Sequence, residues 1–315
     1  MKTVIQSWIT VLALFFICQS TQAQVMVSGL SSPPKPTHPI ATIVSEDVVA
    51  ISVIDIQQFQ VAQLNQATKA ITEIGLLPSE ALQPIGTLTN AELDHVSKLQ
   101  EFGVSKIYFL LRTHYTPHDC FVIPLGGDAK EGTAKKIMQH LQQRDLFKQM
   151  KYQIEPGVLV ISESMPHIDS LLNGPARKDL ATVYEALKRV DEKPIALTVI
   201  GNADTRRVLR ELVPTISGEL EELSGKLIAD QIDRLTISLS FEPDVNLEIK
   251  VETKSPETAA TVQRLLPIGI RMLLENEAVK KSLPTNIAEK IQPALQPELK
   301  ENTVIFSTKS RSDSQ

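Results

Sequence analysis

The chain has 315 residues, more than one typical domain needs and enough for two modest hydrophobic cores. Its formal net charge is -5, whereas proteins that bind the phosphate backbone of nucleic acids usually carry an excess of basic residues, so nucleic acid is a poor candidate partner. Aromatic residues make up only 4% of the chain, which argues against a base-stacking platform or a carbohydrate-binding aromatic shelf.

Residues 1–23 have the pattern of an export signal peptide. Lys2 supplies a positive start, Trp8 to Cys18 is apolar, and small residues up to Ala23 suit a cleavage site. The apolar stretch is shorter than the ~20 residues that span a bilayer, so no transmembrane segment is expected after cleavage. We therefore predict cleavage after Ala23 and a periplasmic or secreted mature chain.

The two cysteines have different expected fates. Cys18 is the acylated residue if the leader belongs to a lipoprotein, but Ile17 stands where such a signal needs a small residue. Cleavage after Ala23 leaves Cys120 alone, which excludes an intramolecular disulfide in the mature chain. We interpret Cys120 as a small apolar strand residue.

Residues 24–41 are rich in serine and proline, most densely across 31–39. Prolines at that density fix φ and remove hydrogen-bond donors, which favours an extended tether over a folded domain. The folded part is expected to begin near Thr42.

The elements predicted next follow one order twice. Strands are indicated by alternation of polar and apolar residues, clearest at 234–241 and 245–252 on either side of a turn. Helices are indicated by apolar residues at helical spacing after capping residues such as Ser255. The first series is a strand at 48–53, helices at 57–71 and 91–102, hairpin strands at 107–111 and 121–125, a helix over 134–141 and a strand at 157–162. The second is a strand at 194–200, helices at 204–213 and 218–227, the hairpin at 234–252, a helix over 255–266 and a strand at 303–307.

This βαββαβ order predicts an α+β fold of two tandem split βαβ, ferredoxin-like units with mainly antiparallel sheets. The predicted organisation along the chain is a first unit at 42–173, a connecting segment at 174–193 with a helix near 180–190, a second unit at 194–309 and a tail at 310–315. The order of elements leaves open whether the two sheets join.

The hairpins of the two units differ on the face that points away from their own helices. The second hairpin presents polar residues there, whereas the first presents Tyr108, Leu110, Cys120, Val122 and Pro124. A largely apolar sheet face is rarely left in water. We expect either the helices around 171–190 or another molecule to cover it, and in the second case Tyr108, Leu110 and Val122 form an interaction surface.

The densest group of possible metal ligands is His114, His118, Asp119 and Cys120, in one predicted hairpin loop. Such side chains can hold zinc. However, Asp119 and Cys120 should point to opposite sides of the strand, and no second cluster completes a four-coordinate site. The sequence also lacks the G-x-S-x-G, H-E-x-x-H, P-loop and G-x-G-x-x-G motifs. We predict no catalytic residues, metal or cofactor.

Several segments resemble a class of uncharacterised secreted proteins of planctomycete-type bacteria. Besides the leader, the resembling segments are the strand running from Val48 into Asp55, the hairpin start at 103–108, the turn at 241–243 and the helix start at 255–260. The resemblance covers most of the mature chain, and it implies a non-enzymatic protein of the envelope or periplasm.

These observations predict an exported, non-enzymatic binding or structural protein that acts through its surfaces, with an unknown protein partner or by self-association. The alternative is a secreted metal-dependent hydrolase with its site near the loop from His114 to Cys120.

Overall fold

The computed structural model describes residues 38–41, 43–45, 47–58, 90–112, 118–126, 131–144, 147–173, 180–201, 203–212, 229–240, 246–275 and 297–307. Several predicted features lie outside these ranges: the leader, most of the tether, nearly all of the helix expected at 57–71, the helix expected at 218–227, His114 and the tail. None of the helices within the ranges combines the length and the apolar character that crossing a bilayer requires.

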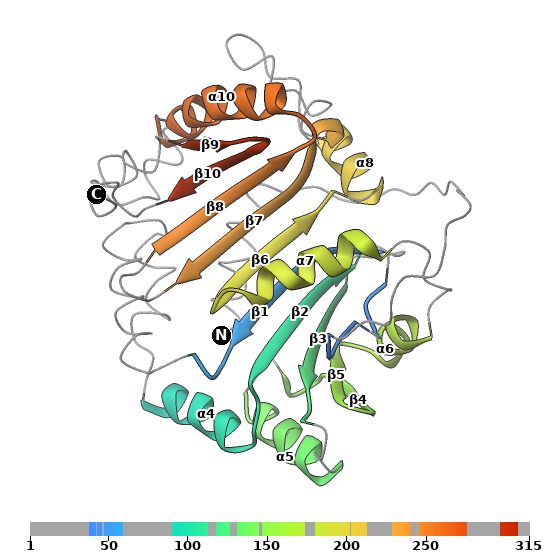
Figure 1. The fold of residues 1–315 in the computed structure, drawn as a ribbon. Coiled ribbons are helices and arrows are strands. Elements are labelled where there is room, and N and C mark those ends of the chain that lie inside the picture. Colours follow the sequence, from blue (N-terminus) through green and yellow to red (C-terminus); the bar gives the residue numbers. More distant parts are fainter. Residues whose placement is uncertain are drawn as a thin grey trace. The chain divides into compact units, whose positions relative to one another are not determined.

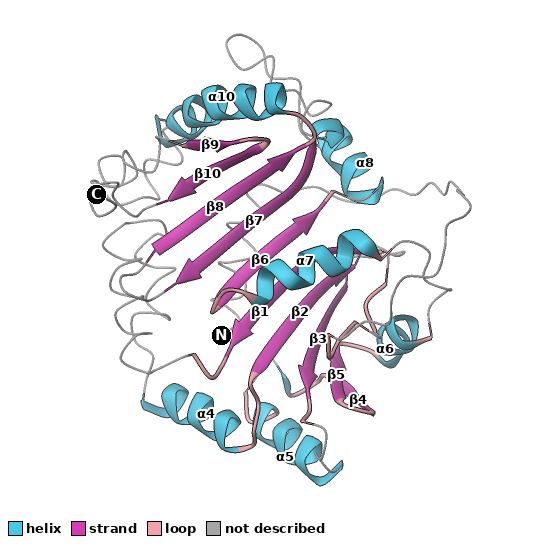
Figure 2. Ribbon diagram, in the orientation of Figure 1, coloured by secondary structure: helices cyan, strands magenta, loops and turns pink. Residues whose placement is uncertain are grey.

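Helices are interspersed among mainly paired antiparallel strands along the described chain, which confirms the α+β class (Figures 1 and 2). The elements up to the middle of the chain are β1 (Val48–Asp55), α4 (Asn90–Glu101), β2 (Lys106–Arg112), β3 (His118–Pro124), α5 (Glu131–Leu141), β4 (Lys151–Glu155), β5 (Val158–Ser162), α6 (Met165–Leu172) and α7 (Ala181–Asp191). They are followed by β6 (Ile195–Ile200), α8 (Ala203–Leu212), β7 (Ile232–Ser240), β8 (Asn246–Thr253), α10 (Pro256–Glu275), β9 (Glu298–Lys300) and β10 (Thr303–Ser307).

The chain divides into two compact units. The first unit contains the described residues 38–58 and 90–204, and the second contains those from 205 onward. Strand order is β4-β5-β3-β2-β1-β6 in the first unit and β7-β8-β10-β9 in the second. The pairings within each unit are antiparallel, as predicted.

The strand order differs from a split βαβ arrangement, in which another strand separates the first two. Here β1 and β2 are direct neighbours, with Ile51 opposite Leu110. The other side of β1 pairs with β6, where Ile51 lies opposite Thr198. The strand expected to open the second unit thus pairs with the opening strand of the first, because alternation identifies a strand but does not show which strand it will pair with.

The apolar face of the first hairpin is interior. Tyr108, Leu110 and Val122 are 1%, 0% and 0% exposed, so the interaction surface predicted from them is wrong. The helices α6 and α7 cover this face, and Figure 2 shows α7 lying along β1 and β6. The helix predicted within 174–193 is therefore the cover that the apolar pattern required. The residues that these helices and the N-terminal segment contribute to the core are Ile40, Ile43, Val44, Ile168, Leu171, Leu180, Val183, Ala186, Leu187 and Val190.

The opposite face of the first sheet is also apolar. Phe109 and Phe121 pair across β2 and β3, with ring centroids 5.3 Å apart and nearly edge-to-face. Phe147, just beyond α5, meets Phe121 at the same centroid distance. Helix α5 buries Ala134, Ile137, Met138 and Leu141, one face at helical spacing, as the sequence predicted.

In the second unit, α10 covers β8 and β10. Ser255 caps the helix, because its Oγ accepts the backbone N–H of Thr258 at 3.2 Å. Ala259 and Val262 then pack with Val304 and Phe306. This small core holds one face of the second sheet.

Truncation of the covered face should destabilise the protein strongly. We expect Leu110→Ala to lower the free energy of unfolding by about 2–5 kcal/mol, because it removes a fully buried side chain and leaves a cavity. Ile54→Ala is the matched control on the neighbouring strand, since Ile54 is 40% exposed, and it should cost less than about 1 kcal/mol. Urea denaturation measures both values, and similar losses would contradict the interior placement of Leu110.

Candidate functional site

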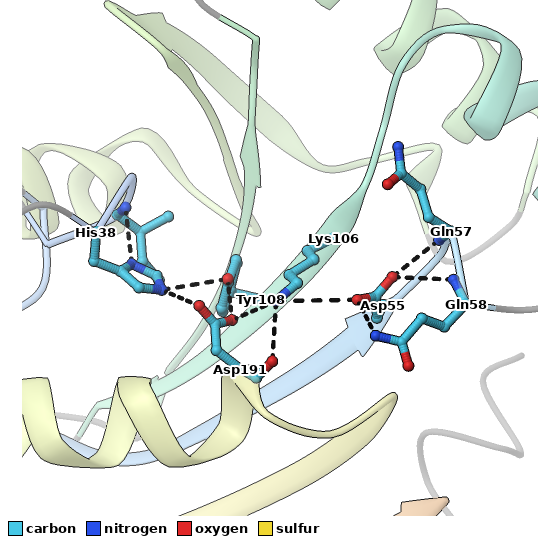
Figure 3. A network of polar contacts seen from close by, with 8 residues as sticks. His38, Asp55, Gln57, Gln58, Lys106, Tyr108 and Asp191 are labelled. Carbon is cyan, nitrogen blue, oxygen red and sulfur yellow. Dashed lines mark hydrogen bonds and ion pairs between the residues drawn. The ribbon is translucent and has the colours of Figure 1, made fainter. Parts of the chain in front are cut away.

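A cluster of four polar side chains lies where the start of the described chain meets the end of α7, and we call it the Asp191 cluster (Figure 3). His38 Nε2 lies 2.6 Å from one carboxylate oxygen of Asp191. The Lys106 ammonium donates to the other oxygen at 3.0 Å and to the backbone carbonyl of Asp191 at 3.2 Å. The Tyr108 hydroxyl donates to the same carboxylate. One carboxylate thus accepts hydrogen bonds from three side chains that come from two separate segments of the chain.

Secondary structure places each member. Lys106 and Tyr108 are two residues apart on β2, so both side chains leave the same face of the sheet. Asp191 is the last residue of α7, where a carboxylate is disfavoured by the negative end of the helix dipole unless donors compensate. His38 comes from the segment before β1, 153 positions from Asp191.

The hydrogen bonds of His38 fix its tautomer. Its Nδ1 accepts the backbone N–H of Ile40 at 3.3 Å, so the ring proton lies on Nε2 and is donated to Asp191. Both ring nitrogens are therefore engaged within the protein.

The cluster shifts two titrations. Burial by itself raises the pKa of Asp191, but hydrogen bonds from His38, Tyr108 and Lys106 outweigh it and lower the pKa to about 2. Burial, followed by the hydrogen bond and the charge of Asp191, raises the pKa of Tyr108 well above its ordinary range. Asp191 is thus held as an anion, and the Tyr108 hydroxyl stays protonated as its donor.

A second carboxylate lies on the other side of Lys106. Asp55 is buried at the end of β1, and its Oδ1 accepts the backbone N–H groups of Gln57 and Gln58, each at 3.1 Å. Its Oδ2 accepts the Gln58 side-chain amide at 2.9 Å and lies 4.0 Å from Lys106 Nζ. This is an Asx-type turn, with the carboxylate used to hold the chain as it leaves the strand.

A buried ion pair fixes the far end of the N-terminal segment. Arg112 is 2% exposed at the end of β2, and its Nη2 lies 2.7 Å from Asp47 Oδ2. The same guanidinium nitrogen contacts the Ser170 carbonyl on α6 at 3.4 Å, and the Ser45 hydroxyl donates to Asp47. Residues 38–47 are thus held at one end by the His38–Asp191 hydrogen bond and at the other by the Asp47–Arg112 ion pair, and we call this stretch the anchor segment.

An aspartate–histidine pair beside a hydroxyl is also the arrangement of acid–base catalysis. In that chemistry one imidazole nitrogen contacts the carboxylate and the other faces the reacting group. In His38 that second nitrogen instead accepts a backbone amide, and the Asp191 oxygens already hold three donors. The arrangement is suited to holding segments together.

Of the predicted metal-ligand group, the structure describes Cys120 and the backbone of His118 and Asp119, whereas His114 lies outside the described residues. Cys120 is buried and its partner across β2 is Leu110, within the core beneath α6 and α7. His118 and Asp119 open β3 by backbone register, opposite Arg112 and Leu111. Across the described ranges, no three histidine, cysteine, aspartate or glutamate side chains are grouped so that they could hold a metal ion.

Two further histidines meet between α4 and α5. His95 Nδ1 and His140 Nε2 are 2.7 Å apart, and Phe102 packs edge-on against His140. Two imidazoles leave a four-coordinate zinc site two ligands short. At this separation the nitrogens share a hydrogen bond.

The sequence offered no signal for the Asp191 cluster. His38 falls inside the predicted tether, and Asp191 reads as a charged residue at the end of a helix. Their contact depends on how α7 lies on the sheet, which local spacing does not encode.

Asp191 should make folding sensitive to acid. Its folded-state pKa of about 2 lies below the ordinary 3.8, so the stability it contributes is present above 3.8 and is lost as the pH falls toward about 2. Across this window we expect the wild type to lose roughly 2 kcal/mol more unfolding free energy than Asp191→Asn, which has no such proton to gain. Urea denaturation of both proteins at stepped pH measures the difference, and equal losses would contradict the depressed pKa.

The function of this site has to be inferred from its geometry. Comparison of the chain with protein-family models, with curated proteins and with solved structures gave no match.

Proposed function

We propose that this chain is an exported, non-enzymatic binding or structural protein of the periplasm or cell envelope that acts through its surfaces. Its resemblance to secreted proteins of planctomycete-type bacteria is part of this proposal. The observation that carries the non-enzymatic role is the engagement of His38, whose two ring nitrogens bind Asp191 and the Ile40 amide.

The anchor segment supports the same proposal. It overlaps the end of the proline-rich sequence 31–39 and carries Ile40 and Val44, both fully buried in the core of the first unit. The Arg112–Asp47 ion pair at one end resists separation, because breaking it leaves a buried charge uncompensated, and the His38–Asp191 hydrogen bond holds the other end. The start of the described chain is in this way joined to the folded unit, which suits a protein that acts through a stable surface.

We also propose that the chain is one folding pattern used twice, although not in the split βαβ form. The described order β1-α4-β2-β3-α5-β4-β5 recurs as β6-α8-β7-β8-α10-β9-β10. The sheet order β2-β3-β5-β4 in the first unit likewise corresponds to β7-β8-β10-β9 in the second. The opening strands of the two series, β1 and β6, pair with each other.

Export is tested by expressing the full chain in a Gram-negative host and fractionating the cells. We expect the protein in the periplasmic fraction, with Gln24 as its first residue by N-terminal sequencing. Ala23→Arg is the control, since a large charged residue at the cleavage position should block processing. A chain that stays in the cytoplasm and still begins at Met1 would overturn the proposed export.

The anchoring role is tested by amide hydrogen exchange. The backbone N–H groups of Ala41 and Ile43 donate to His38 and Ile40 carbonyls, each at 3.0 Å. In His38→Ala we expect these amides to exchange about tenfold faster, because the segment can open once the hydrogen bond to Asp191 is lost. His140→Ala, which removes a histidine from a different contact, should leave their rates unchanged. Unchanged rates in both variants would show that Asp191 does not hold the segment.

A further inference from the structure

The strand β4 ends the sheet of the first unit. It is last in the strand order, and in the described part of the chain its strand partner is β5 alone. The five residues Lys151–Glu155 are exposed or half-buried, whereas β5 beside them is fully buried. An edge of this kind offers its backbone N–H and C=O groups to another strand.

The turn after β4 determines which backbone groups face outward. Pro156 and Gly157 form a two-residue turn, with Gly157 at φ 81, and Glu155 lies opposite Val158. This combination is the one that a type II turn favours, and the residues flanking such a turn hydrogen-bond to each other. Bonding then alternates along an antiparallel pair, so Gln153 and Lys151 also bond toward β5. The N–H and C=O groups of Tyr152 and Ile154 are left facing the open edge.

The side chains of β4 place complementary charges at equal distances from its centre. Lys151 and Glu155 lie at the two ends and carry opposite charges, and Gln153 lies midway. Gln153 Nε2 donates to Glu155 Oε1 at 2.7 Å, which shows that these alternate residues share one face. Tyr152 and Ile154 lie on the other face, beside an open hollow lined also by Leu125, Lys135 and Pro156.

From this charge complementarity we propose that β4 binds β4 of a second copy of this chain as an antiparallel strand, with Gln153 at the two-fold axis. In this register Lys151 lies opposite the partner's Glu155 at both ends, and Tyr152 lies opposite the partner's Ile154. Tyr152 of each strand then exchanges two backbone hydrogen bonds with Ile154 of the partner, which gives one closely spaced pair of hydrogen bonds on either side of the axis.

The charge pattern selects this register over its neighbours. If the register shifts so that Tyr152 lies opposite the partner's Tyr152, then Lys151 lies opposite the partner's Gln153. If the register shifts in the other direction, Glu155 lies opposite the partner's Gln153. Either shift loses both cross-strand ion pairs, which contribute to the pairing of adjacent strands. Backbone polarity and charge therefore favour the same arrangement.

The pairing is short, so the dimer is concentration-dependent. Stable interfaces bury about 1,600 Å² in total, and a five-residue edge with its flanking side chains covers less than that. We expect a dissociation constant on the order of micromolar. The inference stands on the geometry of β4 and is independent of the proposed export, because a chain in any compartment carries the same edge.

Charge reversal tests the register with its own control. In Lys151→Glu, the new glutamate lies opposite the partner's Glu155 at both ends of the strand pair. In Glu155→Lys, the new lysine lies opposite the partner's Lys151 at both ends. Each variant alone should dimerise at least tenfold more weakly than the wild type. An equimolar mixture should recover dimerisation, because each strand then meets the opposite charge at both ends. Sedimentation equilibrium measures all four samples, and recovery in the mixture also shows that both variants are folded.

The proposal is overturned if the wild type is monomeric up to about 1 mM, or if the mixture stays as monomeric as its components. A dimer that neither reversal weakens likewise places the interface elsewhere. None of these results bears on the location of the mature chain in the cell.

A cysteine at the axis gives a second, independent measurement. In Gln153→Cys the two introduced thiols belong to a pair whose Cα atoms are about 4.5 Å apart, within the range that a disulfide spans. Mild oxidation should give a dimer linked at position 153 in both chains, as mapped by mass spectrometry. Lys151→Cys is the matched control on the same face and should cross-link at least tenfold more slowly. Equal cross-linking at both positions would overturn the register.

Discussion

The carboxylate of Asp191 joins three parts of the first unit that are remote in the chain. His38 comes from the anchor segment, Lys106 and Tyr108 come from β2, and Asp191 ends the helix that covers the sheet. Removing a carboxylate from water is costly, and the cost is offset here because each oxygen is hydrogen-bonded. The orientation of α7 and the path of the N-terminal segment are therefore coupled, since both depend on hydrogen bonds to the same carboxylate.

The apolar face of the first hairpin explains why α7 and the N-terminal segment have to be held in place. Tyr108, Leu110 and Val122 must be covered, and α6 and α7 cover them with the connection that follows β5. Tyr108 serves both functions, because its ring lies in the core while its hydroxyl reaches Asp191 at the edge. The same side chain thus links hydrophobic burial to the polar cluster, as an amphipathic aromatic residue can.

The two ends of the first sheet are treated differently. Strand β6 pairs with β1 at one end, so that edge of β1 is occupied. At the other end β4 is short and charged at both ends, which are two features that natural proteins use to limit unwanted association at a sheet edge. The same charges make one partner acceptable, namely an antiparallel copy of β4, so an edge that discourages random pairing remains specific for itself.

The sequence by itself determined the α+β class, the antiparallel hairpins, most of the described elements and the need to cover the face that carries Leu110, because these follow from spacings of two and 3.6 residues within short windows. It also predicted the covering helix near 180–190, which the structure places as α7. Only the tertiary structure decided that β6 joins β1, that the cover is internal, and that His38 meets Asp191 across 153 positions. Strand partners and hydrogen bonds of that separation depend on how whole elements pack, and the energy of that packing is not recorded in any local pattern.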